Sequence, residues 1–376
     1  MIVSIIGVGL IGGSIGLAIK KSGLKVKKVI GIGRNLERLK LAKKIGAVDE
    51  ITTDINEGVK NADIVFVCLP VGLIAQTTKS IFPYCKKDAI ITDVGSVKQP
   101  IVNDIEKFLN TYHLPLTAVF IGGHPIAGSE KTSVKYASKD LFENAVVVLT
   151  PTEKTDRKSL DIVKKLWEKM KAKVKIMSPT RHDRILAMTS HLPHAVAFAL
   201  VNSADNFEFA GTGFKDTTRI ASSDPEMWAD IIFNNRTNVR CAIKRIKFEL
   251  GKIEKEKTVK KLVDIFKKAK TKRDKIAKNN QTKTEHMFGN KLNREEKKLL
   301  NEIRILEFIK MSLKRRKISP SVREVADYFN MSVSTSHTYL KNLRNKKLIK
   351  VRSVQNKIKS VARGITKNKN RTNVRF

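Results

Sequence analysis

The stretch Ile2-Val3-Ser4-Ile5-Ile6-Gly7-Val8-Gly9-Leu10-Ile11-Gly12 near the start of the chain decides the fold of its first half. Its first five residues predict a buried strand over 2–6, and the spacing of apolar residues beyond it predicts a helix over 11–22. The glycines between strand and helix follow the pattern Gly-x-Gly-x-x-Gly. In this context Gly7 permits a tight turn, Gly9 lets the backbone approach a pyrophosphate, and Gly12 allows close helix packing. We therefore predict that a dinucleotide is bound by Gly7, Gly9, Leu10, Ile11 and Gly12 at the helix N-terminus.

A merely flexible glycine turn is the alternative, but the strand and helix on either side favour the cofactor. Downstream, short apolar runs alternate with helical patterns, which indicates a mainly parallel, doubly wound sheet of the Rossmann type over residues 1–178. The predicted strands are 28–32, 64–69, 89–94, 117–121, 145–149 and 173–177. The predicted helices between them are 36–45, 72–82, 98–110 and 156–171.

The end of the second predicted strand bears on the choice of cofactor. It reads Gly31-Ile32-Gly33-Arg34-Asn35, with no acid before Glu37 to hold a ribose 2′-hydroxyl. A missing carboxylate beside a guanidinium suits a 2′-phosphate, so Arg34 favours NADP over NAD. If Arg34 is instead solvated and stacks loosely on adenine, either cofactor is acceptable.

Composition limits the class of protein. The 376 residues suggest two or three domains, and 41% hydrophobic residues exclude a wholly disordered chain. The net charge of +38 favours anionic partners, and residues 281–376 hold 25 Lys and Arg against 7 Asp and Glu. Cys68, Cys85 and Cys241 lie far apart, which argues against disulfide and metal sites. The uncharged residues 1–19 are too rich in glycine for a membrane span, so we expect a cytoplasmic protein without membrane contact.

Beyond residue 178 the pattern changes. Apolar residues at helical spacing predict an all-α domain over 179–276. The polar, aperiodic residues 277–293 predict a linker. A third domain is predicted over 294–366, with helices at 294–314, 321–329 and 333–346 and an extended basic segment over 348–365.

Four polar clusters carry chemistry. Two follow predicted strand ends, where open parallel sheets bind ligands, and two lie in the helical domain. They contain histidines that can accept a proton, hydroxyls that can orient them, and an arginine suited to a carboxylate. The clusters are Asp93-Val94-Gly95-Ser96-Val97-Lys98, His124-Pro125-Ile126-Ala127-Gly128-Ser129-Glu130, Ser190-His191-Leu192-Pro193-His194 and Gly213-Phe214-Lys215-Asp216-Thr217-Thr218-Arg219, the last leading to Asp224-Pro225-Glu226-Met227-Trp228.

Together these motifs resemble the prephenate dehydrogenase family, also called cyclohexadienyl or arogenate dehydrogenases, over residues 1–276. The resemblance implies a nucleotide-binding domain followed by a helical domain that forms a homodimer. It also implies oxidative decarboxylation of prephenate to 4-hydroxyphenylpyruvate, on the route to tyrosine. Nothing in the residues reads the difference between the pyruvyl side chain of prephenate and the alanyl side chain of arogenate.

The resemblance implies a role for each site residue. His124 takes the proton of the ring hydroxyl, Ser96 orients that histidine, and Arg219 binds a substrate carboxylate. Further substrate contacts come from Lys215, Trp228, His191, Ser190 and Glu130, and His194 is a second catalytic candidate.

For three of these residues a purely structural role is the alternative. His194 lies on an apolar helix and could be a core histidine bonded internally. His124 follows two glycines in what reads as a loop beyond a strand end, where a structural role is less common. Ser96 could cap a helix, and that role is compatible with orienting His124.

The third domain reads as helix, tight turn, helix. Near the start of the second helix lie small polar side chains that suit base edges in a major groove: Ser334, Thr335, His337 and Thr338. Basic residues for phosphate contacts follow them: Lys341, Arg344, Lys346, Lys347, Lys350 and Arg352.

Over 294–366 this domain resembles the winged-helix DNA-binding domain of the LexA repressor. The run Pro320-Ser321-Val322-Arg323-Glu324-Val325-Ala326 carries the likeness, and 361–365 corresponds to the returning strand of the wing. The resemblance implies binding of double-stranded DNA; a protein-docking module is the alternative.

Two functions from different classes follow. The first is an NAD(P)-dependent prephenate dehydrogenase carrying a DNA-binding appendage. The second is a transcriptional regulator whose dehydrogenase-like domain only senses a ligand. The presence of His124, Ser96 and Arg219 favours the enzyme, because a sensor has no need of a base.

Overall fold

The computed structural model describes residues 1–112, 118–128, 133–289, 294–316, 319–329, 331–346, 348–351 and 365–366. The chain divides into two compact units, Met1–Lys255 and Glu256–Phe376. The predicted domain bounds of 1–178, 179–276 and 294–366 stay predictions, because these two units do not separate the first two domains.

The first unit is built on a parallel sheet with the strand order β3-β2-β1-β4-β5-β6. The order reverses between β1 and β4, and at such a switch point ligands bind beyond the carboxyl ends of the strands. This confirms the predicted doubly wound sheet and adds the short β3, whose three residues are too few for a clear pattern. The strands are β1 (Ile2–Ile6), β2 (Lys28–Ile32), β3 (Glu50–Thr52), β4 (Ile64–Val67), β5 (Ala89–Asp93) and β6 (Ala118–Ile121).

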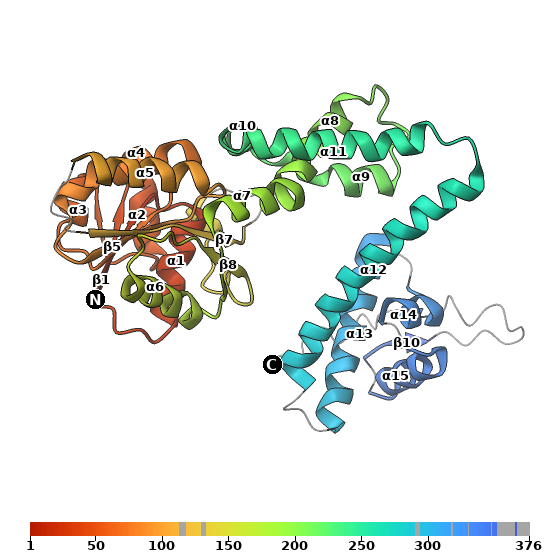
Figure 1. The fold of residues 1–376 in the computed structure, drawn as a ribbon. Helices are drawn as coiled ribbons and strands as arrows, with labels where there is room; N and C mark the ends of the chain where they lie inside the picture. The colour runs from red at the N-terminus through yellow and green to blue at the C-terminus, as the bar shows by residue number, and fades with distance from the viewer. Residues whose placement is uncertain are drawn as a thin grey trace, which may run out of the picture. The chain divides into compact units, whose positions relative to one another are not determined.

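Helices cover both faces of this sheet (Figure 1). Alternate residues of β1 point to opposite faces, so Val3 and Ile5 pack in one core and Ile6 in the other. On one face lie α1 (Leu10–Lys21), α2 (Leu36–Lys44) and α6 (Arg157–Lys169). On the other lie α3 (Ile55–Val59), α4 (Val71–Ile81) and α5 (Gln99–Tyr112). Two short 3₁₀ turns are η1 (Phe82–Tyr84) and η2 (Val134–Tyr136).

A second, three-stranded sheet has the order β7-β8-β9 and consists of Gly123–Ile126, Val146–Leu149 and Lys173–Ile176. The last two were predicted as strands, but within the same layer as the rest. The first corrects the sequence analysis, because His124 lies in an edge strand and not in a loop. Pro125 lies opposite Val147 in the antiparallel pair of β7 and β8. An edge strand tolerates a proline, which donates no hydrogen bond, and this explains why Gly-Gly-His-Pro reads as a turn.

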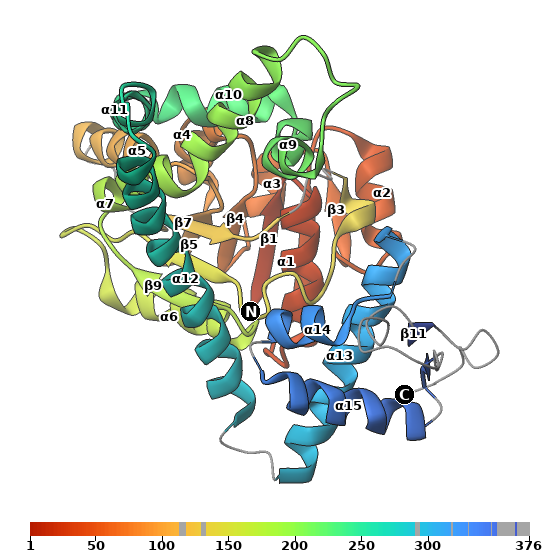
Figure 2. The same cartoon turned by 90° about the vertical axis from the view of Figure 1, so that its right-hand side faces the viewer.

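The rest of the first unit is helical, as predicted. The helical run from Pro179 to Asn202 is interrupted by a π-helical turn, where Pro193 has no N–H to donate to the carbonyl of Thr189. Helix α10 packs against α4 (Figure 2). The elements are α7 (Pro179–Leu186), the π turn η3 (Ala187–His191), α8 (Leu192–Asn202), α9 (Thr212–Thr218), η4 (Arg219–Ser222), α10 (Pro225–Asn234) and α11 (Arg236–Glu254).

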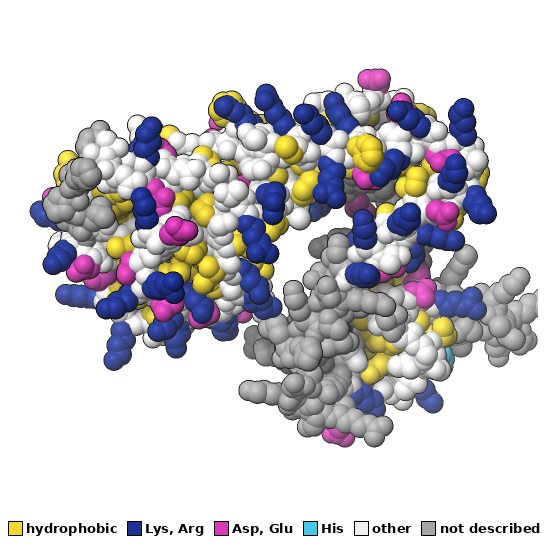
Figure 3. Space-filling view, viewed as in Figure 1, with side chains coloured by type: hydrophobic (Ala, Val, Ile, Leu, Met, Phe, Trp, Pro, Cys, Tyr) yellow, Lys and Arg dark blue, Asp and Glu magenta, His cyan; other side chains and the backbone are white. Residues whose placement is uncertain are grey.

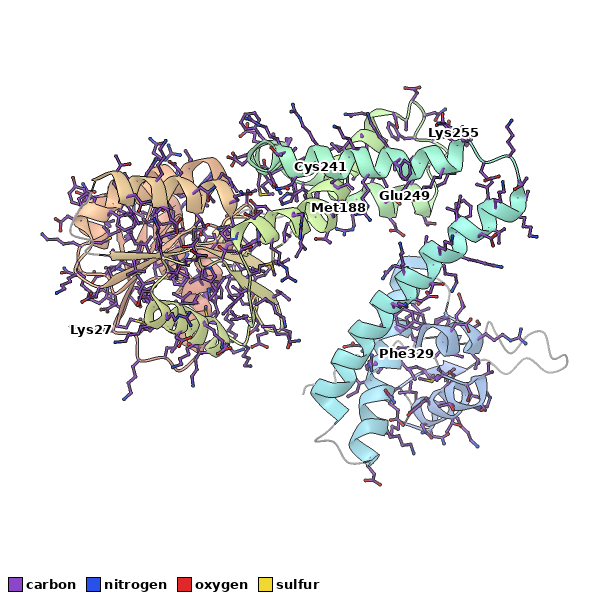
Figure 4. The ribbon with its side chains drawn as sticks, viewed as in Figure 1. Lys27, Met188, Cys241, Glu249, Lys255 and Phe329 are labelled. Atoms are coloured by element: carbon purple, nitrogen blue, oxygen red, sulfur yellow. The ribbon has the colours of Figure 1, made fainter. Side chains whose placement is uncertain are left out.

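The second unit contains α12 (Val259–Gly289), α13 (Arg294–Arg316), α14 (Val322–Phe329) and α15 (Val333–Asn345). A two-stranded antiparallel ladder joins β10 (Lys350–Val351) to β11 (Ile365–Thr366). A small core gathers Ile305, Ile309, Val325, Leu340, Leu343 and Ile349. Phe329, labelled at the end of α14 in Figure 4, packs edge-on against Phe308 at 5.7 Å between ring centroids.

Two predictions for this part of the chain have mixed outcomes. Residues 277–289 are helical, whereas an irregular linker was expected over 277–293; the segment lacks an apolar stripe, but its lysines, glutamine and alanine favour a helix. The predicted returning strand of the wing falls at 361–365, of which the structure describes residue 365 in β11 and leaves 361–364 outside the described residues.

Candidate active site

The glycine turn has the geometry that a dinucleotide requires. Gly7 has a φ of +89°, and a Cβ there would lie 2.3 Å from the carbonyl oxygen of Cys68. A Cβ on Gly12 would lie 2.3 Å from the carbonyl oxygen of Gly7. Helix α1 starts without a side-chain cap or an acidic residue in its first turn, so its first N–H groups face outward for a phosphate. The turn therefore fits a pyrophosphate.

His124 is buried in β7, at 7% exposure. Its Nδ1 lies 2.8 Å from Nε2 of His182, which belongs to α7. Nδ1 of His182 in turn lies 2.7 Å from Oδ1 of Asp183. These three side chains form a hydrogen-bonded chain that joins the second sheet to the helical part of the unit.

The hydrogen bonds assign the tautomer of each ring. The Asp183 carboxylate also accepts main-chain N–H groups, from Lys98 at Oδ1 (2.7 Å) and from Gln99 at Oδ2 (2.9 Å), so it acts as an acceptor. His182 therefore donates through Nδ1 and, when neutral, accepts through Nε2. His124 must then donate through Nδ1, which leaves its Nε2 as a free acceptor.

The surroundings of His124 keep the ring neutral. Burial lowers its pKa well below the usual 6.5, and the neighbouring His182, Lys98 and His191 lower the pKa further. At neutral pH the imidazole is therefore unprotonated. A buried, neutral histidine with its Nε2 unprotonated can act as a general base.

Two further histidines lie on the helical side. Burial lowers the pKa of His191 to about 4, although Asp183 opposes this shift. Nδ1 of His191 is 3.0 Å from Nδ2 of Asn235, and the same amide donates to the main-chain oxygen of Asp183. His194 stacks on Trp228, with 3.4 Å between ring centroids and 17° between planes.

His194 is half-buried, and its Nδ1 donates to the carbonyl of Ser190 at 3.0 Å. Burial lowers its pKa, and the positive charge of Arg219 adds to that effect. Arg219 belongs to η4, which packs against α8, the helix that carries His194. Lys215 is one helical turn before Arg219, and both side chains are exposed. These cations can attract an anionic substrate.

The structure thus brings together most of the residues expected from the sequence: His124, His191, His194, Trp228, Arg219 and Ser190. Ser96 is half-buried, and its carbonyl raises the pKa of His191 against the effect of burial. The hydrogen bond of the His124 ring is with His182, so an orienting role of Ser96 stays a prediction. Glu130 lies outside the described residues.

His182 and Asp183 were not predicted. One signal in the sequence could have found them: both precede Leu186 and Ala187 at helical spacing, which places the four residues on one side of a helix. In the structure all four side chains are buried. A histidine and an aspartate on the buried side of a helix need polar partners, and each has one here.

In the second unit, α15 presents the predicted DNA-binding residues on its exposed side: Ser334, Thr335, His337, Thr338 and Lys341. Its opposite side places Ser336, Leu340 and Leu343 in the core. Lys346, which was also predicted to contact a phosphate, pairs with the buried Glu302 at 2.5 Å. Its ammonium group is therefore less available for a phosphate than that of Lys341.

Three family models match the chain. One described as prephenate dehydrogenase, nucleotide-binding domain, matches residues 15–176, and one described as prephenate dehydrogenase, dimerization domain, matches residues 178–268. One described as LexA DNA binding domain matches residues 301–357.

Curated relatives agree with the first two matches. Prephenate dehydrogenase of Bacillus subtilis is 38% identical over 280 residues, which cover 71% of this chain and 74% of the relative. Cyclohexadienyl dehydrogenase of Zymomonas mobilis is 31% identical over 242 residues, covering 62% and 80%.

Solved structures agree as well. Prephenate dehydrogenase from Aquifex aeolicus, in complex with hydroxyphenyl propionate and NAD+, has a TM-score of 0.66 and 39% identity, covering 73% of this chain and 98% of its own. Arogenate dehydrogenase of Synechocystis has a TM-score of 0.63 and 29% identity, covering 73% and 100%.

Proposed function

Because the chain belongs to the prephenate dehydrogenase family, we propose that it oxidatively decarboxylates prephenate to 4-hydroxyphenylpyruvate and passes a hydride to a nicotinamide cofactor. The observation that carries the proposal is the chain from Asp183 through His182 to His124, which leaves Nε2 of His124 ready to accept a proton.

In the proposed reaction, Nε2 of His124 accepts the proton of the ring hydroxyl as the hydride leaves the same ring carbon. The bound nicotinamide supplies the hydride acceptor. Asp183 stabilises the positive charge that develops on the paired rings of His124 and His182. Loss of carbon dioxide then makes the ring aromatic, so the reaction is effectively irreversible.

Arg219 and Lys215 are proposed to hold the substrate by a carboxylate. A guanidinium can bind a carboxylate through two parallel hydrogen bonds, which fixes its orientation. His191, His194, Trp228 and Ser190 are proposed to contact the rest of the substrate, with Trp228 held by the stacked His194. Ser96 is proposed to orient His124, and Glu130 is proposed to contact the substrate.

The decisive experiment is a turnover assay. Purified full-length protein is mixed with prephenate and either NAD or NADP, and the absorbance of the reduced cofactor is followed. His124→Asn should lower kcat by about 10²–10⁴-fold without loss of cofactor binding, because only the base is removed. Unchanged turnover in this variant would exclude His124 as the base.

Arogenate and a non-enzymatic regulator are the alternatives that the same assay addresses. Faster turnover of arogenate would identify an arogenate dehydrogenase instead. Binding of prephenate and cofactor without any turnover would favour a ligand-sensing regulator.

We propose NADP as the preferred cofactor. Arg34 is exposed just beyond the end of β2. The nearby acids have other partners, because Glu37 pairs with Lys40 at 2.9 Å and Asp54 caps α3. A ribose 2′-phosphate therefore meets a cation and not a free carboxylate. Titration of the protein with both nucleotides tests this, and tighter binding of NAD would refute it.

We propose a homodimer formed through the helical part of the first unit. Apolar side chains are exposed there, including Phe233 (64%), Phe248 (65%) and Leu250 (56%). Figure 3 shows many Lys and Arg side chains on the surface of this part. Figure 4 labels Met188 of η3 on the same part. Large apolar side chains exposed in this way favour association.

The segment Pro179–Asn202 is long and apolar enough to cross a membrane by length and composition alone. Coverage by a second copy accounts for the same apolar surface, because the matched dimerization domain includes this segment. We propose that the protein works in the cytoplasm.

We further propose that α15 binds double-stranded DNA. Its exposed polar side chains suit base edges, and Lys341 and Arg344 suit phosphates. Fluorescence anisotropy with DNA duplexes should show affinity that falls as salt rises, and Lys341→Ala should weaken it. The matched control is Lys252→Ala on α11. Absence of binding at low salt would leave the domain as a protein-docking module.

A further inference from the structure

The described residues of the first unit include a fully buried lysine to which the proposed mechanism assigns no role. Lys98, at 0% exposure, directly precedes α5. Its ammonium group pairs with Asp93, also at 0%, and donates to the carbonyl oxygen of Gly123 at 2.8 Å. Burial lowers the pKa of Lys98, and the charge of Asp93 opposes that shift.

Gly123 is the residue directly before His124, and both of its peptide groups are held. Its N–H donates to Oδ1 of Asp93 at 3.0 Å, and its carbonyl accepts from Lys98. Asp93 is itself fixed by the N–H of Gly95 at 2.8 Å. The backbone that carries His124 is therefore attached to a buried ion pair at the end of β5.

The backbone of Lys98 contacts Asp183, at the far end of the hydrogen bonds that start from His124. Its N–H donates to Oδ1 of Asp183 at 2.7 Å, and this is the oxygen that accepts from Nδ1 of His182. Lys98 thus contacts the residue before His124 through its side chain and the carboxylate behind His182 through its backbone.

We propose that Lys98 is a positioning residue for the dehydrogenase reaction, fixing both ends of the His124–His182–Asp183 chain so that Nε2 of His124 is presented to the substrate. The proposal rests on the proposed function. Stability alone does not explain the pair, because buried ion pairs are often no more stabilising than apolar side chains of similar size. A small displacement of a general base, in contrast, can cost about 10²-fold in rate.

The ammonium group also acts on the charge of His124. Among the described residues, the ionisable groups around this ring are His182 from α7 with Asp183 behind it, His191 from η3, and the Lys98–Asp93 pair at the end of β5. Lys98 disfavours the protonated ring. Removal of its charge should therefore move the acid limb of kcat/KM to higher pH.

The test compares Lys98→Met with the double variant Asp93→Asn/Lys98→Met. The single variant leaves Asp93 buried without its partner and risks unfolding, whereas the double variant removes both charges. Lys79→Met is the matched control, because Lys79 pairs with Asp104 on the surface of the same part of the chain. We expect kcat of the folded double variant to fall about 10²-fold, with KM and cofactor affinity little changed. Where Lys98→Met alone folds, its acid limb should move to higher pH, because Asp93 keeps its charge in that variant.

Three outcomes decide the proposal when the wild type turns over. A selective fall in kcat of the folded double variant, with KM retained, supports it. A folded double variant with the kcat of the wild type overturns it. A loss of activity that only follows the loss of folded protein, with the pH profile unchanged, also overturns it.

If the wild type shows no turnover, the proposed function fails and the positioning role is tested without it. The chain has 7 histidines, so ¹⁵N labelling of histidine resolves few signals. In the wild type His124 should be protonated at Nδ1 alone. A mixture of tautomers in the double variant supports the role of Lys98, and an unchanged tautomer contradicts it.

Discussion

Asp183 accepts hydrogen bonds through both carboxylate oxygens, and this fixes the direction of every bond that follows it toward His124. An aspartate in this position orients a histidine and stabilises its protonated form. What distinguishes this site is that a second ring, His182, lies between the carboxylate and the base.

Asp183→Asn should therefore lower kcat strongly, by about 10²–10⁴-fold, while the fold is retained. In either orientation the amide NH₂ group faces a main-chain N–H, of Lys98 or of Gln99, and the negative charge is lost. With the NH₂ group toward His182, the direction of the hydrogen bonds reverses and a proton is placed on Nε2 of His124. Steady-state kinetics would measure the loss. Asp156→Asn, which changes the cap of α6, is the control and should keep its activity. Wild-type kcat in Asp183→Asn would contradict the assigned tautomer.

Burial of His191 makes the stability of the first unit depend on pH. The unfolded chain binds a proton at this residue near pH 6.5, but the folded protein only near its pKa of about 4. Between these values the unfolded state holds more protons, so the free energy of unfolding falls as pH falls. The contribution lost by pH 5 is about 2 kcal/mol.

His191→Gln should therefore flatten this dependence between pH 7 and pH 5. Denaturant unfolding can be followed by the fluorescence of Trp167 and Trp228, because the chain's 2 tryptophans both lie in the first unit. An equally steep loss of stability in wild type and variant would show that His191 is not the group responsible.

Among single residues, the sequence identified the site residues that belong to motifs and missed those that do not. His124, His191 and Arg219 stand in recognisable clusters with glycine, proline or charged neighbours. His182 and Asp183 stand in an ordinary polar helix start, and only the fold shows that His182 bonds His124 and that Asp183 bonds His182. Their role depends on a contact between residues 58 positions apart.

Among the elements, α1 has no room for a side chain at Gly12. Its Cβ position is 2.3 Å from the carbonyl oxygen of Gly7, a backbone atom that cannot swing aside. Gly12→Ala should push α1 away from the turn and weaken cofactor binding by at least about tenfold, with a loss of about 1–3 kcal/mol in stability.

Calorimetric titration with NAD and NADP measures this effect. Gly251→Ala is the control, because the same change in α11 meets no atom within 4 Å and should slightly stabilise the helix. Equal cofactor affinity in Gly12→Ala and wild type would show that the helix can shift without harm to the turn.

Elements with a strong period were predictable, and elements that depend on tertiary pairing were not. The strands of the main sheet are apolar runs. The predicted strands 2–6 and 28–32 coincide with β1 and β2, and the predictions 64–69 and 89–94 extend one or two residues beyond β4 and β5. Strand β7 contains a glycine and a proline, both of which are turn signals, and it exists because β8 pairs with it. The π turn before α8 likewise reflects how Pro193 is accommodated.

On the scale of the whole molecule, the exposed apolar residues of α11 predict self-association. Phe248→Glu should convert the dimer to monomers, because a buried charge without a partner opposes the interface. Sedimentation velocity measures the change. Ile162→Glu, at a 47% exposed apolar residue of α6 outside the matched dimerization domain, is the control and should leave the dimer intact. A dimer in both variants would place the interface elsewhere.

The order of domains along the chain could be predicted because each has its own pattern: alternating strands and helices, then helices alone, then a short basic helical domain. The chain of contacts that completes the site could not, because it joins residues from the first two of these patterns. His124 comes from a strand before residue 178, and its partners come from a helix after it.

That junction limits how the two halves can be exchanged. A hybrid protein that keeps residues up to 178 and takes its later helices from another dehydrogenase would inherit His124 but not the groups that determine where its proton sits. The dehydrogenase that supplies the helices would need a histidine and an acid at the positions of His182 and Asp183. Recombination at this border is therefore constrained by two side chains, however well the backbones join.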